Sequence, residues 1–364
     1  MRVGIDIRSF TSEKTGIGWY TYTLLQELVR LHPKDEFYGC WNGKMYPAEE
    51  VLSNHSARVS SLERKLATIA MLLEHPKYNV DLYHHHSFIS FPAKDTVNVL
   101  TAHDVYFKLC PQHIKASTRL TANFLAGDLI KKSNYVIAVS RYTASTVCYY
   151  YPQATDKITV VHNGIDLKFF SSAGTAKDAA AILGFDKPYI LYVGGFAPHK
   201  NVDQLIRAYD SLAIKHSDLP ELVLVGKDYW GSKKVYGEYE QATAKSKIHI
   251  LGYIAREYLP TLYANSRAFV FPSLHEGFGL PPVEAMAGGT AVLVSVQPAL
   301  VEVCEDAALY TDYDHEAIAR TLERLVYDET TNRTLRARGR ERAKLFSAER
   351  MAEQTYQVYL KALA

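Results

Sequence analysis

The chain has 364 residues, 22% of them charged, and its 41 Lys and Arg against 39 Asp and Glu give a formal net charge of +2. This length predicts two domains, each large enough to bury its own core, and the near balance of charge argues against a strongly basic nucleic-acid-binding protein. The four cysteines are scattered without a CxxC pair, which excludes a disulfide framework and a structural zinc site.

A cytoplasmic location is expected from the start of the chain and from its hydropathy. Arg2, Asp6 and Arg8 interrupt the short apolar start, so no signal peptide is predicted. No run reaches the roughly 18 apolar residues that a membrane span requires. We therefore expect the protein in the cytoplasm, at most peripheral at the inner face of the cell membrane.

Apolar runs rich in β-branched residues alternate along the chain with stretches of helical period. Such an alternation predicts parallel sheets covered on both faces, the doubly wound α/β class. The predicted strands are VGIDI (3–7), VNVLTA (97–102), YVIAVS (135–140), ITVVHN (158–163), YILYVGG (189–195), ELVLVGK (221–227), IHILGY (248–253), AFVFPS (268–273) and TAVLVS (290–295).

The segment SSAGTAKDAA, residues 171–180, is small and polar and is the best candidate for a linker. It predicts an amino-terminal domain of residues 1–170 and a carboxyl-terminal domain of residues 173–345. The last stretch, residues 348–364, is predicted to form one helix with a stripe of apolar side chains.

Two features of the first domain follow predicted strands. Gly16 and Gly18, in TGIGWYTY, form a glycine loop between the first strand and a helix, but without the full dinucleotide-binding spacing. His103 and Asp104 follow the strand 97–102, at the edge of a parallel sheet where ligands bind. A histidine there is more often structural than catalytic.

Two other patterns in this domain have ordinary interpretations. The run His84, His85 and His86 suggests a metal site, but consecutive residues of a strand point to opposite faces and cannot all bind one ion. In SLERKLATIAMLL, residues 61–73, the apolar stripe is typical of a helix that faces a core. The alternative is a membrane-surface helix that admits a lipid-linked acceptor.

In the second domain, the strand 189–195 ends in two glycines, and Lys200 stands before the next helix. A lysine in this place is well suited to neutralise a diphosphate. The alternative is a solvated surface lysine.

The segment HEGFGLPPVEAMAGG, residues 275–289, connects a strand to a short helix at the carboxyl end of that strand. Pro282 suits the first helical position, and Gly288 with Gly289 ends the helix. Gly277 and Gly279 allow backbone N–H groups to approach a ligand, and the helix start favours an anion.

Glu276 and Glu284 flank this turn and are poor ligands for phosphate, because like charges repel. They are better suited to accept hydroxyl protons, Glu284 from the ribose of a nucleotide and Glu276 from an attached sugar. A sugar linked to a nucleoside diphosphate supplies the hydroxyls and the anion together. The alternative is that Glu284 caps its helix and Glu276 is solvated.

This segment resembles the E-x7-E signature of the retaining family 4 glycosyltransferases, whose GT-B fold has two Rossmann-like domains facing a cleft. The resemblance extends over nearly the whole chain and is greatest to the polysaccharide mannosyltransferase branch. The matching segments, in the family's order, are TGIGWYTYTLLQEL, TAHDVYFKLCP, IAVSRYTASTV, VVHNGID, YVGGFAPHKNVDQLIRAY and VEVCEDAALY.

The resemblance implies that the second domain binds a nucleotide-sugar donor, that the first binds a glycan or lipid-linked glycan acceptor, and that the helix 348–364 crosses back to the first domain. His103, Lys200 and Glu276 are the implied catalytic residues, and Asp104 is a candidate contact for the acceptor. The implied donor-binding residues are Gly16, Gly18, Gly195, Lys200, Glu276, Gly277, Phe278, Gly279, Leu280 and Glu284. Family members often carry an arginine at the position of Gly195, so here phosphate binding is expected to depend more on Lys200.

The implied activity is a metal-independent hexosyl transfer in surface polysaccharide synthesis, with no cofactor and no nucleic-acid partner. GDP-mannose is the expected donor, and UDP-glucose or another UDP-sugar is the alternative. A glycoside hydrolase with Glu276 and Glu284 as acid and base needs no phosphate-binding lysine and is disfavoured. The E-x7-E wording argues against an epimerase on the same fold, and a non-catalytic nucleotide-sugar-binding subunit is the alternative of another class.

Overall fold

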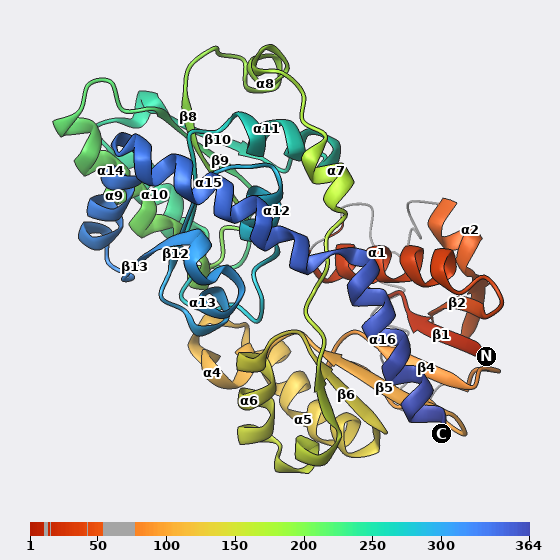
Figure 1. Ribbon diagram of the computed structural model, residues 1–364. Helices are drawn as coiled ribbons and strands as arrows, with labels where there is room; N and C mark the ends of the chain where they lie inside the picture. Colours follow the sequence, from red (N-terminus) through yellow and green to blue (C-terminus); the bar gives the residue numbers. More distant parts are fainter. Residues whose placement is uncertain (11–13, 15, 42, 54–76) are drawn as a thin grey trace. The chain divides into compact units, whose positions relative to one another are not determined.

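The computed structural model describes residues 1–364 except 11–13, 15, 42 and 54–76 (Figure 1). Within it the chain forms two compact units, one of residues Met1–Gly164 with Ser347–Ala364, and one of residues Ile165–Phe346. The predicted linker, residues 171–180, therefore lies inside the second unit. The predicted helix at residues 61–73 lies outside the described residues.

The sheet of the first unit has seven strands in the order β3-β2-β1-β4-β5-β6-β7. All neighbours are parallel except β2 and β3. The strands are β1 (Arg2–Asp6), β2 (Glu36–Trp41), β3 (Lys44–Pro47), β4 (Leu82–His85), β5 (Val97–Ala102), β6 (Tyr135–Ala138) and β7 (Ile158–Val160).

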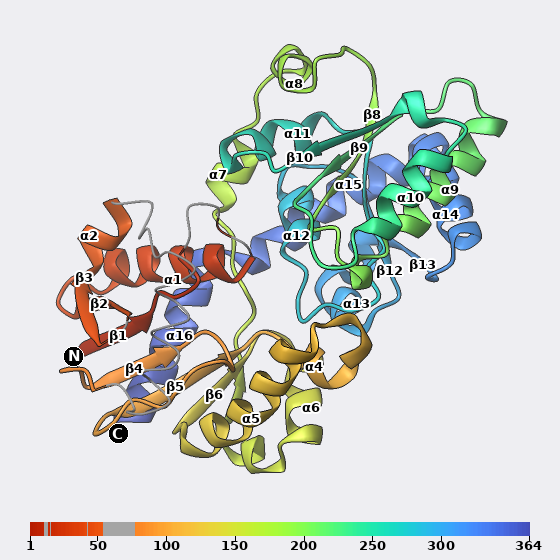
Figure 2. The same cartoon turned by 180° about the vertical axis from the view of Figure 1, so that it is seen from behind.

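Helices cover both faces of this sheet (Figures 1 and 2). They are α1 (Gly16–Leu31), α2 (Ala48–Ser53), α4 (Tyr106–Leu109), α5 (Ala116–Lys132), α6 (Arg141–Tyr150) and α16 (Ala348–Leu363). The apolar sides of α1 and α16 share one core with β1, in which Leu24, Leu28 and Tyr359 are fully buried. On the other face, α5 and α6 pack their apolar sides against β5 and β6.

The sheet of the second unit is entirely parallel, with six strands in the order β10-β9-β8-β11-β12-β13. Its central strands are continuous apolar runs because helices cover both faces, as the sequence pattern predicts. The strands are β8 (Tyr189–Val193), β9 (Glu221–Val225), β10 (Ile248–Gly252), β11 (Ala268–Phe271), β12 (Val292–Ser295) and β13 (Ala308–Thr311).

Nine helices longer than one turn belong to the described part of this second unit. They are α7 (Leu167–Ser171), α8 (Ala176–Leu183), α9 (Val202–Lys215), α10 (Lys233–Gln241), α11 (Leu259–Asn265), α12 (Leu280–Ala287), α13 (Pro298–Cys304), α14 (His315–Tyr327) and α15 (Glu329–Ala343). The helices α9 and α14 pack against each other, and so do α12 and α15.

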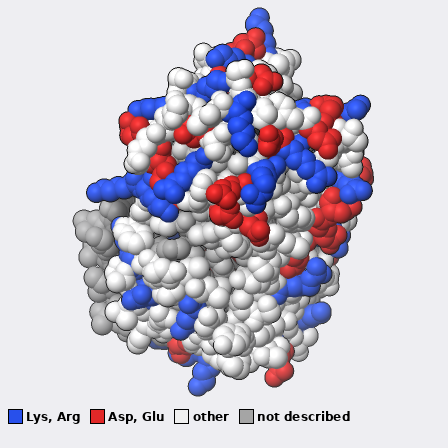
Figure 3. All heavy atoms as spheres, turned by 90° about the vertical axis from the view of Figure 1, so that its left-hand side faces the viewer, with Lys and Arg blue, Asp and Glu red and all other residues white. Residues whose placement is uncertain are grey.

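The surface seen in Figure 3 carries Lys and Arg side by side with Asp and Glu over its upper part. Many charges of the described residues are paired, for example Arg207 with Glu238, and Lys234 with the buried Asp203 at 2.6 Å. Mixed signs on this face fit the small net charge of the chain. A nucleic-acid-binding surface is typically of one sign.

Candidate active site

The loops that carry Lys200 and Glu276 meet in the second unit because their strands, β8 and β11, are neighbours. From β8 the sheet continues through β9 on one side and β11 on the other, so the strand order reverses between β8 and β11. Open α/β sheets bind ligands at the carboxyl ends of the strands at such a point. A hydrogen bond of 2.7 Å from the Leu274 N–H to the His199 carbonyl ties the two loops together.

The loop after β11 turns sharply into α12 at Gly279, whose φ is +96°. A Cβ atom at this position would lie 2.5 Å from Leu300 Cδ2, so both the backbone conformation and the space require glycine. Pro281 and Pro282 lie in the first turn of α12, and Gly288 is its C-cap. The helix begins at Leu280, two residues before the predicted start at Pro282, which places Glu284 fifth in the helix.

Lys200 and Glu276 form an ion pair, with Lys200 Nζ 2.6 Å from Glu276 Oε1. Both side chains are largely buried, 19% and 12% exposed, and the lysine ammonium lies 5.2 Å from the ring centroid of Phe271. The solvated alternatives for these two residues are therefore wrong. A positive and a negative group lie side by side at the carboxyl edge of β8 and β11, where an anionic group and a hydroxyl could bind together.

Glu284 lies in the helix that follows this turn, and its carboxylate has a different partner from that of Glu276. Glu284 Oε2 accepts a hydrogen bond of 2.9 Å from the Tyr263 hydroxyl of α11. Burial raises the pKa of Glu284, while the positive charge of Arg256 and the bond from Tyr263 act in the opposite direction. The N-cap of α12 is Gly279, which has no side chain, and Glu284 does not act as the cap.

Phe278 and Gly195, two of the implied donor-binding residues, each lie against an aromatic ring of the second unit. The Phe278 ring is buried and packs at an angle of 81° against Phe346, so its side chain belongs to the core. At Gly195 a Cβ atom would lie 2.3 Å from the ring of Tyr229. The Tyr229 ring thus fills the space where a side chain at position 195 would begin.

In the first unit, His103 and Asp104 follow β5 as predicted. The His103 ring lies edge-on against Tyr20, with ring centroids 4.7 Å apart, and burial lowers the pKa of His103 to about 4. One carboxylate oxygen of Asp104 accepts a hydrogen bond of 2.9 Å from the Tyr106 N–H at the start of α4.

Gly16 and Gly18 lie inside the first turn of α1, not in a loop before the helix. The prediction of a glycine loop is wrong in this respect. A Cβ atom on Gly18 would lie 2.7 Å from the Ser9 carbonyl oxygen, so glycine is needed where the helix meets the segment after β1. At Gly16 no atom of the described residues lies within 4 Å of the corresponding point.

His84 and His85 project to opposite faces of β4 and are fully hydrogen-bonded there. His84 bonds to the Tyr359 hydroxyl at 2.6 Å and to Thr101 at 2.8 Å. His85 bonds to Ser90 and Asn98, each at 2.8 Å. Two of the three histidines of this run are therefore buried, hydrogen-bonded residues of the core. Among the described residues, no group of three His, Cys, Asp or Glu is placed to hold a metal ion.

Comparison with known proteins identifies the family. Residues 14–169 match the family described as "Glycosyltransferase Family 4", and residues 177–342 match "Glycosyl transferases group 1". The chain is 30% identical to O-antigen chain mannosyltransferase B of Escherichia coli, over 95% of this chain and 96% of that protein. This chain belongs to the family 4 glycosyltransferases.

Solved structures show the same fold for this glycosyltransferase. Sucrose-phosphate synthase of Thermosynechococcus elongatus matches with a TM-score of 0.74 and 22% identity, over 99% of this chain and 98% of that one. The Anabaena protein HepE, in complex with UDP and glucose, matches with a TM-score of 0.73 and 17% identity, over 99% and 100% of the two chains. The fold is GT-B, as the sequence resemblance implies.

Sequence reasoning missed Gln297 at this site of the glycosyltransferase. Its Nε2 donates to the Glu276 carbonyl at 3.0 Å, and its Oε1 caps α13 by accepting from the Leu300 N–H. The residue is 1% exposed. One signal in the sequence is that Gln297 precedes Pro298 at a helix start, but nothing there reveals its bond to the backbone of Glu276.

The structure also bears on whether a helix of this enzyme could span a membrane. Across the described ranges, none of the helices combines the length and the apolar character that a bilayer span requires.

Proposed function

We propose that this glycosyltransferase moves mannose from GDP-mannose to a glycan or lipid-linked glycan acceptor in surface polysaccharide synthesis. The full-length match to an O-antigen chain mannosyltransferase supports the sugar and the acceptor class. The observation that carries the proposal is the Lys200–Glu276 pair, held beside the start of α12 at the reversal of strand order. A lipid-linked acceptor would place the enzyme at the inner face of the cell membrane.

In this proposal the second unit binds the donor. The Lys200 ammonium, the positive end of the α12 dipole and backbone N–H groups of the loop before this helix stabilise the diphosphate as it leaves. Glu276 accepts from hydroxyls of the transferred sugar, and Glu284 accepts from the ribose. With these positive groups in place, the reaction proceeds without a metal ion.

The transfer itself occurs with retention of configuration. The acceptor oxygen forms a bond to the anomeric carbon on the face from which the diphosphate departs, and the bond between that carbon and the phosphate oxygen breaks. The hydroxyl proton of the acceptor passes to the departing diphosphate. His103 contacts the transferred sugar.

The donor is tested by screening GDP- and UDP-sugars for slow hydrolysis, which needs no acceptor. We expect hydrolysis of GDP-mannose, a raised unfolding temperature with GDP, and rates that EDTA leaves unchanged. Hydrolysis of UDP-glucose alone would favour the second candidate, which the UDP and glucose complex of HepE supports. Absence of hydrolysis and of nucleotide stabilisation would contradict the proposal.

A further inference from the structure

A cavity of about 160 Å³ lies in the first unit at the carboxyl ends of β4 and β5. Its walls come from the residues after these strands, from α4 and α5, and from Ile17 of α1. In this sheet β1 lies between β2 and β4, so the strand order reverses beside the cavity. The position is that at which open α/β sheets bind small molecules.

Two histidines line the cavity with ring nitrogens that have no hydrogen-bond partner within the part of the chain that the structure describes. His86 is 2% exposed, and neither of its ring nitrogens has a hydrogen-bond partner among the described residues. The same holds for Nε2 of His103. Because a buried polar atom without a partner is unfavourable, a ligand that supplies partners is expected to bind here.

The histidines are uncharged. Burial lowers the pKa of His86 to about 3 and that of His103 to about 4. A neutral imidazole offers one N–H donor and one nitrogen acceptor. A hydroxyl group can donate and accept, so it matches either nitrogen.

The rest of the wall combines apolar side chains with several hydroxyl groups and one carboxylate. Phe88 and Phe107 contribute rings that meet at 69°, with centroids 5.7 Å apart. Such surfaces suit the C–H face of a sugar ring. Among the described residues that line the cavity, Asp104 is the only Asp, Glu, Lys or Arg, and its carboxylate would repel an anionic ligand.

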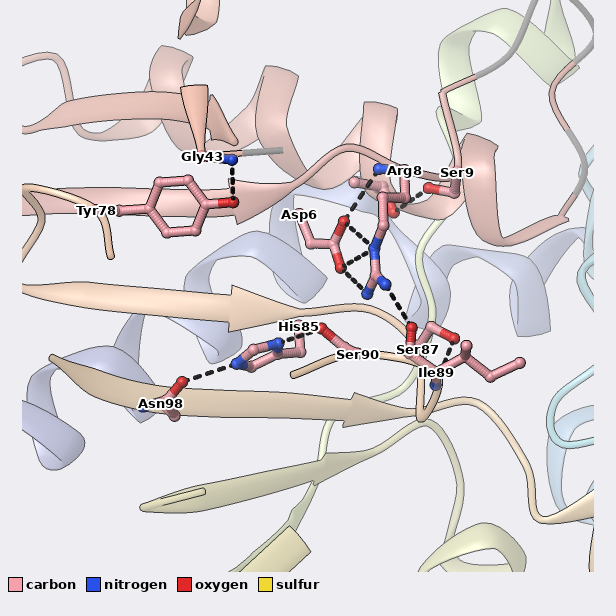
Figure 4. A network of polar contacts seen from close by, with 11 residues as sticks. Asp6, Arg8, Ser9, Gly43, Tyr78, His85, Ser87, Ile89, Ser90 and Asn98 are labelled. Carbon is pink, nitrogen blue, oxygen red and sulfur yellow. Dashed lines mark hydrogen bonds and ion pairs between the residues drawn. The ribbon is translucent and has the colours of Figure 1, made fainter. Parts of the chain in front are cut away.

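A buried ion pair holds the loop that forms one side of the cavity. Arg8 donates to the carboxylate of Asp6 through Nε at 2.9 Å and, at its far end, to the Ile89 carbonyl. Figure 4 shows the guanidinium between Asp6 and the loop with Ser87 and Ile89. Because Asp6 and the Ile89 carbonyl bind this guanidinium, and Arg8 is not among the residues that line the cavity, Arg8 positions the loop without offering its charge to a ligand there.

We propose that this cavity binds the uncharged terminal sugar of the acceptor through His86, beside the His103 that contacts the transferred sugar, and that it excludes sugars bearing a phosphate or carboxylate. That the bound sugar is the acceptor rests on the proposed function. The cavity thus selects neutral glycans over sugar phosphates.

The first test measures binding of neutral methyl hexosides and of their 6-phosphates to the full chain with GDP, by ligand-observed NMR. At least one neutral hexoside is expected to bind, and its 6-phosphate at least about tenfold more weakly. His86→Phe should abolish binding of the neutral sugar, and His86→Gln, which keeps a donor and an acceptor, should restore part of it. Equal binding of both forms, or binding of neither, would overturn the proposal.

A matched pair of variants tests the role of charge without touching a histidine. Thr118 lines the cavity from the first turn of α5, and its neighbour Ser117 does not. Thr118→Lys should strengthen binding of the 6-phosphate several-fold relative to the neutral sugar. Ser117→Lys adds the same charge one residue away and should leave that ratio unchanged. The same change in both variants would show a long-range field instead of a cavity and would contradict the proposal.

The two proposals fail in different ways. If GDP does not stabilise the protein but neutral sugars bind and depend on His86, the donor assignment is wrong and the cavity remains a sugar site. If GDP binds but the His86 and Thr118 variants change nothing, the donor assignment holds and the cavity proposal is wrong.

Discussion

In both units the strand order reverses beside the first strand of the sheet, yet the loops at these two places carry different kinds of polar group. In the second unit the reversal has a lysine paired with a glutamate beside a helix start. In the first unit the loops at the reversal carry neutral histidines within a largely apolar wall. One topology thus supports a site suited to an anion and a site suited to an uncharged polar molecule, and only the side chains in the loops decide which.

The largest effect that would sharpen this comparison is expected from Lys200→Ala. Removal of one group that stabilises developing charge costs about 3 to 4 kcal/mol, or roughly 10²- to 10³-fold in turnover. The measurement is donor hydrolysis together with the unfolding temperature, which should change little. Lys234→Ala is the control, because Lys234 also pairs with a carboxylate, that of Asp203, but far more of its side chain is exposed. A variant at position 200 with the wild-type rate would refute the phosphate role.

Glu284→Gln should weaken binding of the nucleotide but not of inorganic pyrophosphate, since we assign Glu284 to the ribose. Hydrogen bonds to charged groups contribute about 1.5 to 3 kcal/mol, so the Kd for GDP is expected to rise about tenfold or more. Titration calorimetry with both ligands checks this. Equal loss for pyrophosphate would assign Glu284 to the diphosphate instead.

Acidification should destabilise the first unit through its buried histidines. The pKa of His85, His86 and His103 lies well below the ordinary 6.5, so the unfolded chain takes up protons first as the pH falls. The contribution of these histidines to the free energy of unfolding is therefore fully present above pH 6.5. Between pH 6.5 and about 4 it falls by about 1.4 kcal/mol per pH unit for each histidine. Denaturant unfolding at pH 7.5, 6 and 5 measures the slope.

His86→Phe provides the control for this pH dependence. The variant should lose the contribution of one histidine to the slope, whatever its stability at pH 7.5. An unchanged slope would mean that His86 is not buried in its neutral form.

The smallest effect is expected from Gln297→Ala. It removes the hydrogen bond to the Glu276 carbonyl and the cap of α13, for a loss of about 1 kcal/mol. The unfolding temperature should fall modestly, and donor hydrolysis should fall less than in the Lys200 variant. An effect on hydrolysis as large as that of Lys200→Ala would show that the loop position of Glu276 depends on Gln297 alone.

Much of the fold was predictable because its central strands are continuous apolar runs. The strand 97–102 was predicted with its observed bounds, and β8, β9 and β11 begin at their predicted residues. β2, EFYGCW, was missed because Gly39 and polar residues interrupt its apolar pattern. β13, ALYT, was missed because it is only half-buried at its centre and lacks the β-branched apolar run of the other strands.

The candidate site was predictable in its residue types but not in its contacts. The spacing of Glu276 and Glu284 around glycines and prolines located the turn, and Lys200 was placed before the next helix. The 2.6 Å pairing of Lys200 with Glu276 depends on the adjacency of β8 and β11, which are separated by two other strands in the sequence. The bonds of Tyr263 and Gln297 are tertiary contacts that no local pattern encodes.

The helix α16 has a consequence for biosynthesis. Tyr359 and Met351 are buried in the core of the first unit, although the whole second unit lies between them and Gly164 in the chain. During translation the amino-terminal sheet must therefore wait, with part of its apolar surface uncovered, until the ribosome has made nearly every residue of the enzyme. Nascent chains that stall before α16 has been made would expose that surface and depend on chaperones.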